Sequence, residues 1–256
     1  MSDAWMPGVR YIRAAADGGP LKGGAPRVVW QTLGADPQTV SARSAAQRLD
    51  QGGCASHLVW NPLNGEIVQL IPIVRAACPP GWLDCARSAG WPGPAQAAGP
   101  SASEVTAEGR VCVQVCVVAF ADAPFTSGPL AGLREIMTWL DSWGVPRRWP
   151  AGSPAPFPEC HATARSRRLW ARGGHYGASQ VPGLAATGPG AIDVERLTGR
   201  TVTRTADGPV QLRPGSRLAA GEAPRPGPGR PGYDGDELGD LLGTHVAGAA
   251  SLSRAR

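Results

Sequence analysis

The amino-acid sequence predicts an α/β domain with a mixed central β-sheet flanked by helices, followed by a disordered C-terminal tail. Short β-rich runs alternate with helical patterns up to about residue 205, which is typical of α/β folds. Glycine and proline, 35 and 26 of the 256 residues, are concentrated toward the C-terminus, where the chain carries too little apolar surface to order itself. We therefore predict an extended N-terminal lead-in over residues 1–26, a domain over residues 27–205 and a Pro/Gly/Arg-rich low-complexity tail over residues 206–256.

The first half of the domain is predicted to contain a strand, a helix and a hairpin. Residues 27–32 (RVVWQT) are a short β-rich run bounded by proline and glycine, which indicates a buried strand. Residues 38–51 place apolar side chains at near-helical spacing and end at a Gly-Gly pair. Residues 56–60 and 66–71 flank an Asn-Gly turn signal and predict a β-hairpin. Residues 76–109 show no clear period and are predicted to form a long loop.

The second half is predicted to contain the central strand and the longest helix. Residues 111–120 are apolar on both faces, so this strand should lie inside the sheet with cover on each side. Residues 130–143 carry an apolar helical stripe that ends at a glycine. A proline-rich loop follows over residues 150–160, then a short basic helix or irregular arm over residues 161–172. Residues 194–203 are predicted to form a short helix or a strand end.

Charge and cysteine spacing limit the function classes. The net charge of +5 suits anionic partners such as cell-wall polymers or nucleic acid, but a solvated arginine-rich surface explains it as well, and we predict no nucleic-acid partner. No apolar run reaches the roughly 18 residues of a membrane span, and the N-terminus lacks the features of a classical signal peptide. The six cysteines contain no C-x-x-C pair, so a metal finger is not expected. Free thiols are favoured over a disulfide between Cys78 and Cys85.

The most specific pattern lies in residues 173–193 (GGHYGASQVPGLAATGPGAID). Together with the strand VVWQT and the hairpin SHLVW…GEIVQL, in the same order along the chain, this segment resembles the type 2 N-acetylmuramoyl-L-alanine amidases. These zinc hydrolases are related to peptidoglycan-recognition proteins, and the similarity is to their actinobacterial and phage form. The resemblance covers most of residues 27–193 and implies the amidase type 2 / peptidoglycan-recognition fold, with peptidoglycan as the ligand.

The same resemblance implies a zinc site, and this chain differs from the family at every position that would bind zinc or transfer a proton. The three zinc ligands of the family correspond to Gln31, Ala178 and Gly188, and its proton-handling residues correspond to Cys116 and Ala186. A catalytic zinc requires three ligands from His, Cys or carboxylate and a fourth position for water. We therefore expect no zinc and no catalytic residue at these five degenerate positions.

Three polar side chains, those of Gln31, His57 and His175, are expected to line what remains of the substrate groove. Two other arrangements stay open. One is a rearranged Cys/His metal site that includes the adjacent Cys-His pair at residues 160–161. The other is a nucleophilic pair of Cys116 with His57, against which a buried structural cysteine is strongly favoured.

Exposed aromatic and basic residues offer further contacts. The basic run over residues 165–172, with Trp170, could contact an anionic polymer through charge and stacking, although a solvated face is the simpler interpretation. Trp82 and Trp91 lie on the predicted long loop and are candidates for contact with sugar or with a partner.

Three functions follow from these patterns. The first is a zinc-free degenerate amidase-like protein that binds peptidoglycan fragments or cell-wall polymer. The second is an active cell-wall amidase that uses a displaced metal site or an unidentified mechanism. The third is a phage or cell-envelope assembly component that uses the domain as a scaffold and the tail as a tether. The lack of a classical signal peptide fits a cytoplasmic or phage-associated protein.

Overall fold

The computed structural model describes residues 3–53, 55–77, 101–157, 159, 165–184 and 188–199, with the backbone alone at 101–103. These residues belong to a compact unit that spans Met1–Thr205, and a second unit spans Ala206–Arg256. The division coincides with the predicted start of the tail. The tail itself, the cysteines at 78 and 85, the tryptophans at 82 and 91 and the Cys-His pair at 160–161 lie outside the described residues.

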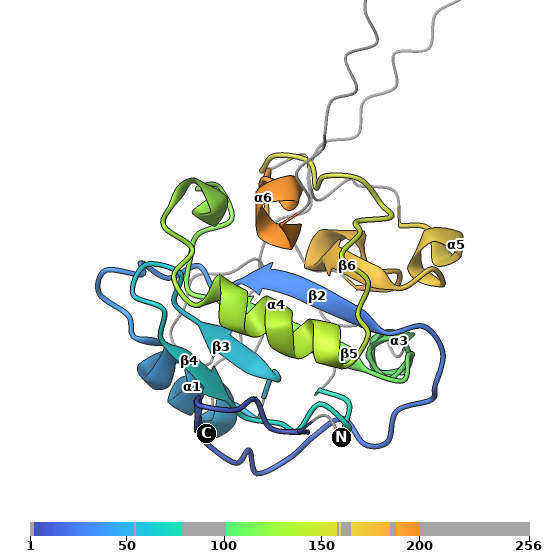
Figure 1. Cartoon of the computed structure of the whole chain (residues 1–256), viewed down its shortest axis with the longest axis horizontal. Coiled ribbons are helices and arrows are strands. Elements are labelled where there is room, and N and C mark those ends of the chain that lie inside the picture. Colours follow the sequence, from blue (N-terminus) through green and yellow to red (C-terminus); the bar gives the residue numbers. More distant parts are fainter. Residues whose placement is uncertain are drawn as a thin grey trace, which may run out of the picture. The chain divides into compact units, whose positions relative to one another are not determined.

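A mixed six-stranded sheet forms the centre of the described domain (Figure 1). Its strand order is β1-β4-β3-β5-β2-β6. The hairpin of β3 and β4 is antiparallel, as predicted, and the other neighbours pair in parallel. The α/β class with a mixed sheet is therefore confirmed. The strands are β1 (Arg10–Tyr11), β2 (Arg27–Thr32), β3 (Leu58–Trp60), β4 (Ile67–Gln69), β5 (Cys112–Val117) and β6 (Gly174–Gly177).

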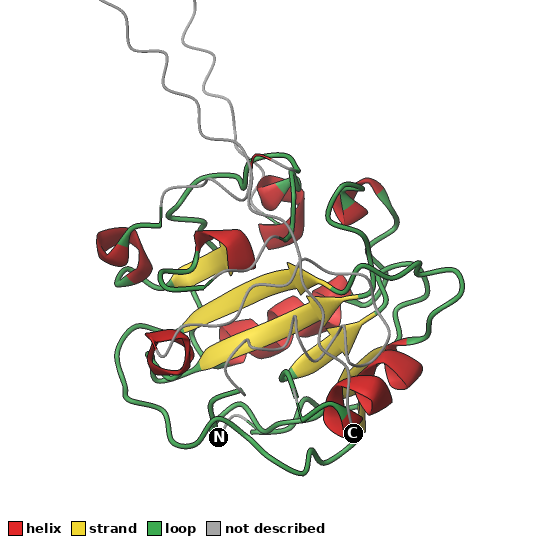
Figure 2. Cartoon of the chain, turned by 180° about the vertical axis from the view of Figure 1, so that it is seen from behind, coloured by secondary structure: helices red, strands yellow, loops and turns green. Residues whose placement is uncertain are grey.

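Helices cover both faces of this sheet. Figure 1 shows α4 in front of the strands, and Figure 2, seen from behind, shows the strands in front of α4. Helix α1 packs on the opposite face, against β3 and β4. In the part of the chain that the structure describes, no helix is long and apolar enough to cross a membrane. The helices are α1 (Ala42–Gln51), α3 (Ser101–Thr106), α4 (Leu133–Ser142), α5 (Arg167–Trp170) and α6 (Val194–Thr198), with 3₁₀ turns η1 (Phe125–Ser127) and η3 (Ala178–Gln180).

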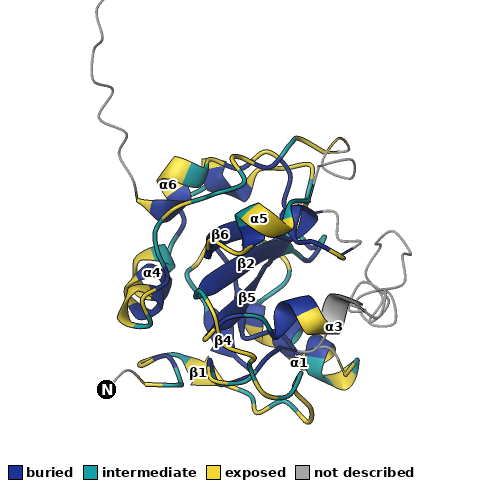
Figure 3. Ribbon diagram, turned by 90° about the vertical axis from the view of Figure 1, so that its right-hand side faces the viewer, coloured by how far each residue is buried: buried dark blue, intermediate teal, exposed yellow. Residues whose placement is uncertain are grey.

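The hydrophobic core lies on both sides of the two central strands. Val28 and Trp30 of β2 pack with Ile136 of α4, whereas Val29 packs on the opposite face with Trp170. All six residues of β5 are buried, and Figure 3 shows β2, β5 and β6 buried in the interior, whereas the edge strand β1 is exposed. The prediction of a central strand with cover on each side is confirmed.

The N-terminal segment, which the sequence predicted to be an extended lead-in, pairs and packs with the rest of the domain. It contributes β1, the edge strand beside β4. The buried side chain of Gln69 accepts a hydrogen bond from the Met6 backbone N–H (2.6 Å) and donates one to the Ala4 carbonyl (3.1 Å). The indole of Trp139 donates to the Asp3 carbonyl (3.0 Å). These contacts therefore join residues on both sides of the predicted boundary at residue 27.

Candidate functional site

The positions that the resemblance implies as metal ligands lie at one end of the sheet. Gln31 of β2 pairs in register with Cys116 of β5. On the other side of β2, Trp30 pairs with Gly177 of β6, so Ala178 follows beside Gln31. Because in-register side chains of parallel strands point to the same face, Gln31 and Cys116 share one face near the carboxyl ends of β2 and β5. Ala178, in η3 directly after β6, packs on that face in a cluster with Val29 of β2 and Cys112 of β5.

Gly188 lies against the same end of the sheet through its backbone. Its carbonyl accepts a hydrogen bond from the Ser179 backbone N–H (3.0 Å). A Cβ atom at Gly188 would lie only 2.5 Å from Oγ1 of Thr32. Thr32 follows Gln31 and therefore points to the opposite face of β2. Gly188 thus lies against Thr32 and Ser179, the residues that follow Gln31 and Ala178, and the structure leaves no room for a side chain at residue 188. Residue 186 lies outside the described residues.

The donor atoms at these positions do not fit a catalytic zinc. The buried Gln31 amide donates a hydrogen bond to the sulfur of Cys116 (2.8 Å), and burial raises the pKa of the Cys116 thiol to about 11. Ala178 is fully buried in an apolar cluster, and Gly188 has no side chain. One neutral amide and one protonated thiol stand where three strong ligands are required. Among the described residues, no group of three His, Cys, Asp or Glu could hold a metal ion.

His57 is buried, with both ring nitrogens bonded to the backbone. Its Nδ1 accepts from the Gln114 N–H (3.0 Å), so the proton lies on Nε2, which donates to the Arg75 carbonyl (2.9 Å). Burial lowers the pKa of His57 to about 4. Neither nitrogen is left to accept a proton from Cys116. The structure therefore does not contain the nucleophilic pair that the sequence left open.

His175 is also buried, between two tryptophan rings. It stacks on Trp30 and on Trp149, with ring centroids 6.0 and 6.1 Å away, and its Nδ1 accepts from the Trp30 indole (3.0 Å). Its Nε2 has no hydrogen-bond partner in the described part of the chain. Burial lowers the pKa of His175 to about 3. The side chains of His57 and His175 are 0% exposed. Because both are fully buried, the structure does not support their predicted contact with a ligand in the groove.

Two residues of the basic run over residues 165–172, Arg167 and Trp170, make contacts within the domain. Trp170 is buried, and the guanidinium carbon of Arg27 lies 4.5 Å from its ring centroid. Arg167 forms an ion pair with Glu108, and the indole of Trp170 donates to the same carboxylate (2.8 Å). Trp170 therefore has no exposed ring face, and the stacking on a polymer that the sequence left open is not available to it.

An apolar recess of about 170 Å³ lies at the end of the sheet where β3 and β5 finish. Phe120 and Leu63 line it and remain 42% and 43% exposed. Ala121, next to Phe120, lies 3.7 Å from a Cβ built on Gly188, so the recess adjoins the degenerate positions. The apolar pattern of residues 111–120 predicted that Phe120 lies inside the central strand. The strand ends at Val117, and the Ala-Asp-Ala-Pro run after Phe120 was the signal that it lies on a turn.

Comparisons with protein-family models, with curated proteins and with solved structures find no match to this chain.

Proposed function

We propose that this chain is a zinc-free amidase-like domain that binds peptidoglycan fragments or related cell-wall polymer without hydrolysing them. The observation that carries the proposal is that Gln31, Cys116 and Ala178 lie on one face near the carboxyl ends of β2, β5 and β6. Ligand sites of α/β sheets commonly lie at this edge. The Gln31 amide donates a hydrogen bond to the Cys116 thiol there, so two neutral groups bonded to each other stand where the family has metal-binding and proton-transferring side chains.

The apolar recess beside these positions supplies the binding surface. Sugar rings and alanine methyl groups of peptidoglycan present apolar faces that pack against aromatic and aliphatic side chains. Phe120 and Leu63 offer such surfaces. Since neither side chain can activate water, this contact provides binding and no hydrolysis.

Calorimetric titration with a purified disaccharide-peptide muropeptide tests the binding. We expect saturable binding, no release of peptide, and an affinity loss of about tenfold or more for Phe120→Asp. Val74→Asp is the matched control, because Val74 is similarly exposed (46%) and does not line the recess; it should bind like the wild type. Equal affinity in both variants would refute the assignment of the recess.

Rebuilding the metal site tests the alignment behind the proposal. The variant Gln31→His, Ala178→His, Gly188→Asp should bind zinc only when Thr32→Ala is added, because the threonine Oγ1 occupies the space that a Cβ at position 188 needs. About one zinc per folded chain is expected for this fourfold variant. A folded fourfold variant without zinc would show that the positions do not correspond to the family's ligands.

A further inference from the structure

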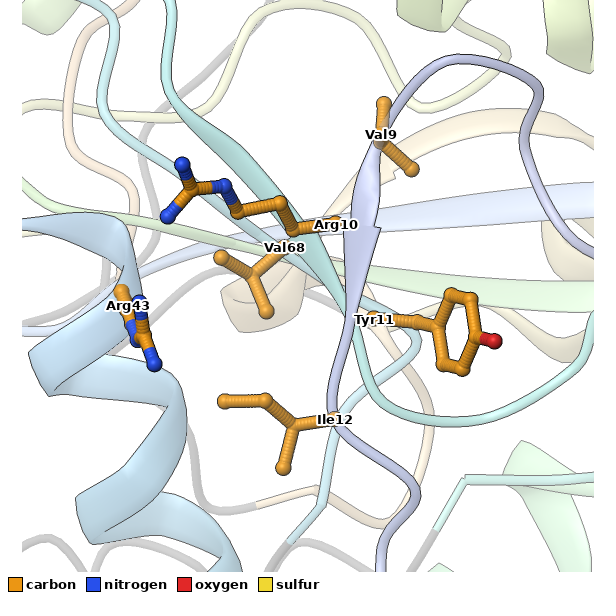
Figure 4. A pocket seen from close by; sticks show the side chains of 6 residues that line it. All are labelled: Val9, Arg10, Tyr11, Ile12, Arg43 and Val68. Carbon is orange, nitrogen blue, oxygen red and sulfur yellow. The ribbon is translucent and has the colours of Figure 1, made fainter.

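A second cavity, of about 400 Å³, lies between the edge strand β1 and helix α1 (Figure 4). It is separate from the degenerate positions and from the apolar recess, since it shares no lining residue with them. Its lining residues are Val9, Arg10, Tyr11, Ile12, Arg43 and Val68. Two of the six are arginines from different elements, and none is acidic.

The fold places the two guanidinium groups around an apolar floor. Arg10 of β1 pairs in register with Val68 of β4, so both side chains point to the face that α1 covers. Arg43 lies in the first turn of α1. Figure 4 shows Arg10 above Val68 and Arg43 to its left, with Ile12 below and the Tyr11 ring pointing away. The cavity therefore combines two cations at its rim with aliphatic side chains at its base.

The carboxylates of Glu66, before β4, and of Asp50, in α1, do not line the cavity and accept hydrogen bonds from backbone N–H groups. Oε2 of Glu66 accepts a hydrogen bond from the Ala42 backbone N–H at the start of α1 (2.7 Å). Oδ1 of Asp50 accepts from the Ala15 backbone N–H (3.0 Å). Within the described ranges, neither Arg10 nor Arg43 forms an ion pair, whereas salt bridges hold several other arginines. Both side chains are exposed at the rim of the cavity, so both guanidinium groups can contribute positive charge to the binding of an anion there.

We propose that this cavity binds a carboxylate or phosphate group carried on an apolar chain. The guanidinium groups of Arg10 and Arg43 hold the oxyanion through charge-assisted hydrogen bonds. The apolar part of the ligand lies on Val68 and Ile12, which removes their surface from water. The proposal does not depend on the function of the degenerate site, because the two sites share no side chain.

Calorimetric titration with octyl phosphate and octanoate, at monomeric concentrations, tests the proposal and separates the two oxyanions. Inorganic phosphate tests the charge alone, and octyl glucoside tests the apolar chain alone. We expect saturable binding of at least one octyl anion, with weaker binding of inorganic phosphate and of the neutral glucoside. Preference for octyl phosphate or for octanoate assigns the oxyanion.

Variants locate the binding to this cavity. Arg10→Gln and Arg43→Gln should each weaken binding of the octyl anion about tenfold or more, since each removes one charged hydrogen-bonding group. Arg168→Gln removes the same charge from an exposed position on α5 and should leave the affinity unchanged. Unchanged thermal unfolding of all three variants shows that the fold is intact. Failure of both octyl anions to bind the wild type, equal losses in all three variants, or equal binding of the glucoside would overturn the proposal.

Discussion

Two buried histidines should make the stability of this domain fall between neutral and mildly acidic pH. His57 and His175 are fully buried, and burial lowers their pKa values to about 4 and about 3. In the unfolded chain a histidine has a pKa of about 6.5. The unfolded state therefore binds more protons than the folded state as the pH falls below about 6.5, so stability is lost with falling pH.

The expected loss is large relative to the stability of an ordinary domain. Below about pH 6.5 each histidine contributes a slope that approaches ~1.4 kcal/mol per pH unit, so each has removed about 2 kcal/mol of stability by the time the pH reaches about 5. Together they remove about 4 kcal/mol out of the roughly 5–15 kcal/mol that stabilises a typical domain. Asp17 and Glu135 have lowered pKa values as well, but the stability they add is lost only below about pH 4, because carboxyl groups stay ionised above it.

Urea unfolding followed by tryptophan fluorescence at a series of pH values measures this slope. His57→Gln is the informative variant, because an amide can accept from the Gln114 N–H and donate to the Arg75 carbonyl without titrating. Its slope should be about half that of the wild type. A flat stability profile in the wild type above about pH 5, or an undiminished slope in the variant, would refute the assignment of these histidines as buried and neutral.

Three further outcomes follow from the structure. Gln69→Leu should lower the free energy of unfolding by about 2–5 kcal/mol, because it leaves buried backbone partners of the N-terminal segment unpaired; Gln47→Leu, at an exposed position of α1, should change it by less than about 0.5 kcal/mol. Cys116 should resist alkylation in the native protein at neutral pH and react on unfolding, as peptide mapping would show, because its thiol is buried and protonated. Gly188→Ala should destabilise the domain by about 1–3 kcal/mol through its contact with Thr32 Oγ1, and less in a Thr32→Ala background; equal losses in both backgrounds would contradict the contact.

Local patterns in the sequence were sufficient for the elements that bury a continuous apolar face. The central strand, the hairpin and the two longer helices were predicted because their periodicity directly reflects burial. Strand β6 was missed because Gly-His-Tyr-Gly has little intrinsic preference for a strand; its pairing with β2 forms it. Helix α3 was missed because six residues, SASEVT, are too short to show a period. Strand β1 has only two residues, and the bonds of Gln69 that anchor its segment join residues far apart in the sequence.

The surroundings of the candidate site residues could not be predicted from the sequence. Order along the chain was enough to align Gln31, Ala178 and Gly188 with the pattern of the family, and in the structure Gly188 lies against Thr32 and Ser179, the residues that follow the other two. The burial of His57 and His175 could not be predicted, because a strand pattern shows which face a side chain occupies but not what packs above it. The hydrogen bond from Gln31 to the thiol depends on strand register, which no local pattern specifies.

The zinc content of the purified wild-type protein, measured together with its cleavage of muropeptides, tests most directly whether the degenerate site is metal-free and inactive. After incubation with zinc and removal of free metal, we expect well below ~0.1 zinc per chain and no cleavage of the bond between N-acetylmuramic acid and L-alanine. About one zinc per chain, with hydrolysis that a chelator abolishes, would contradict the proposed function.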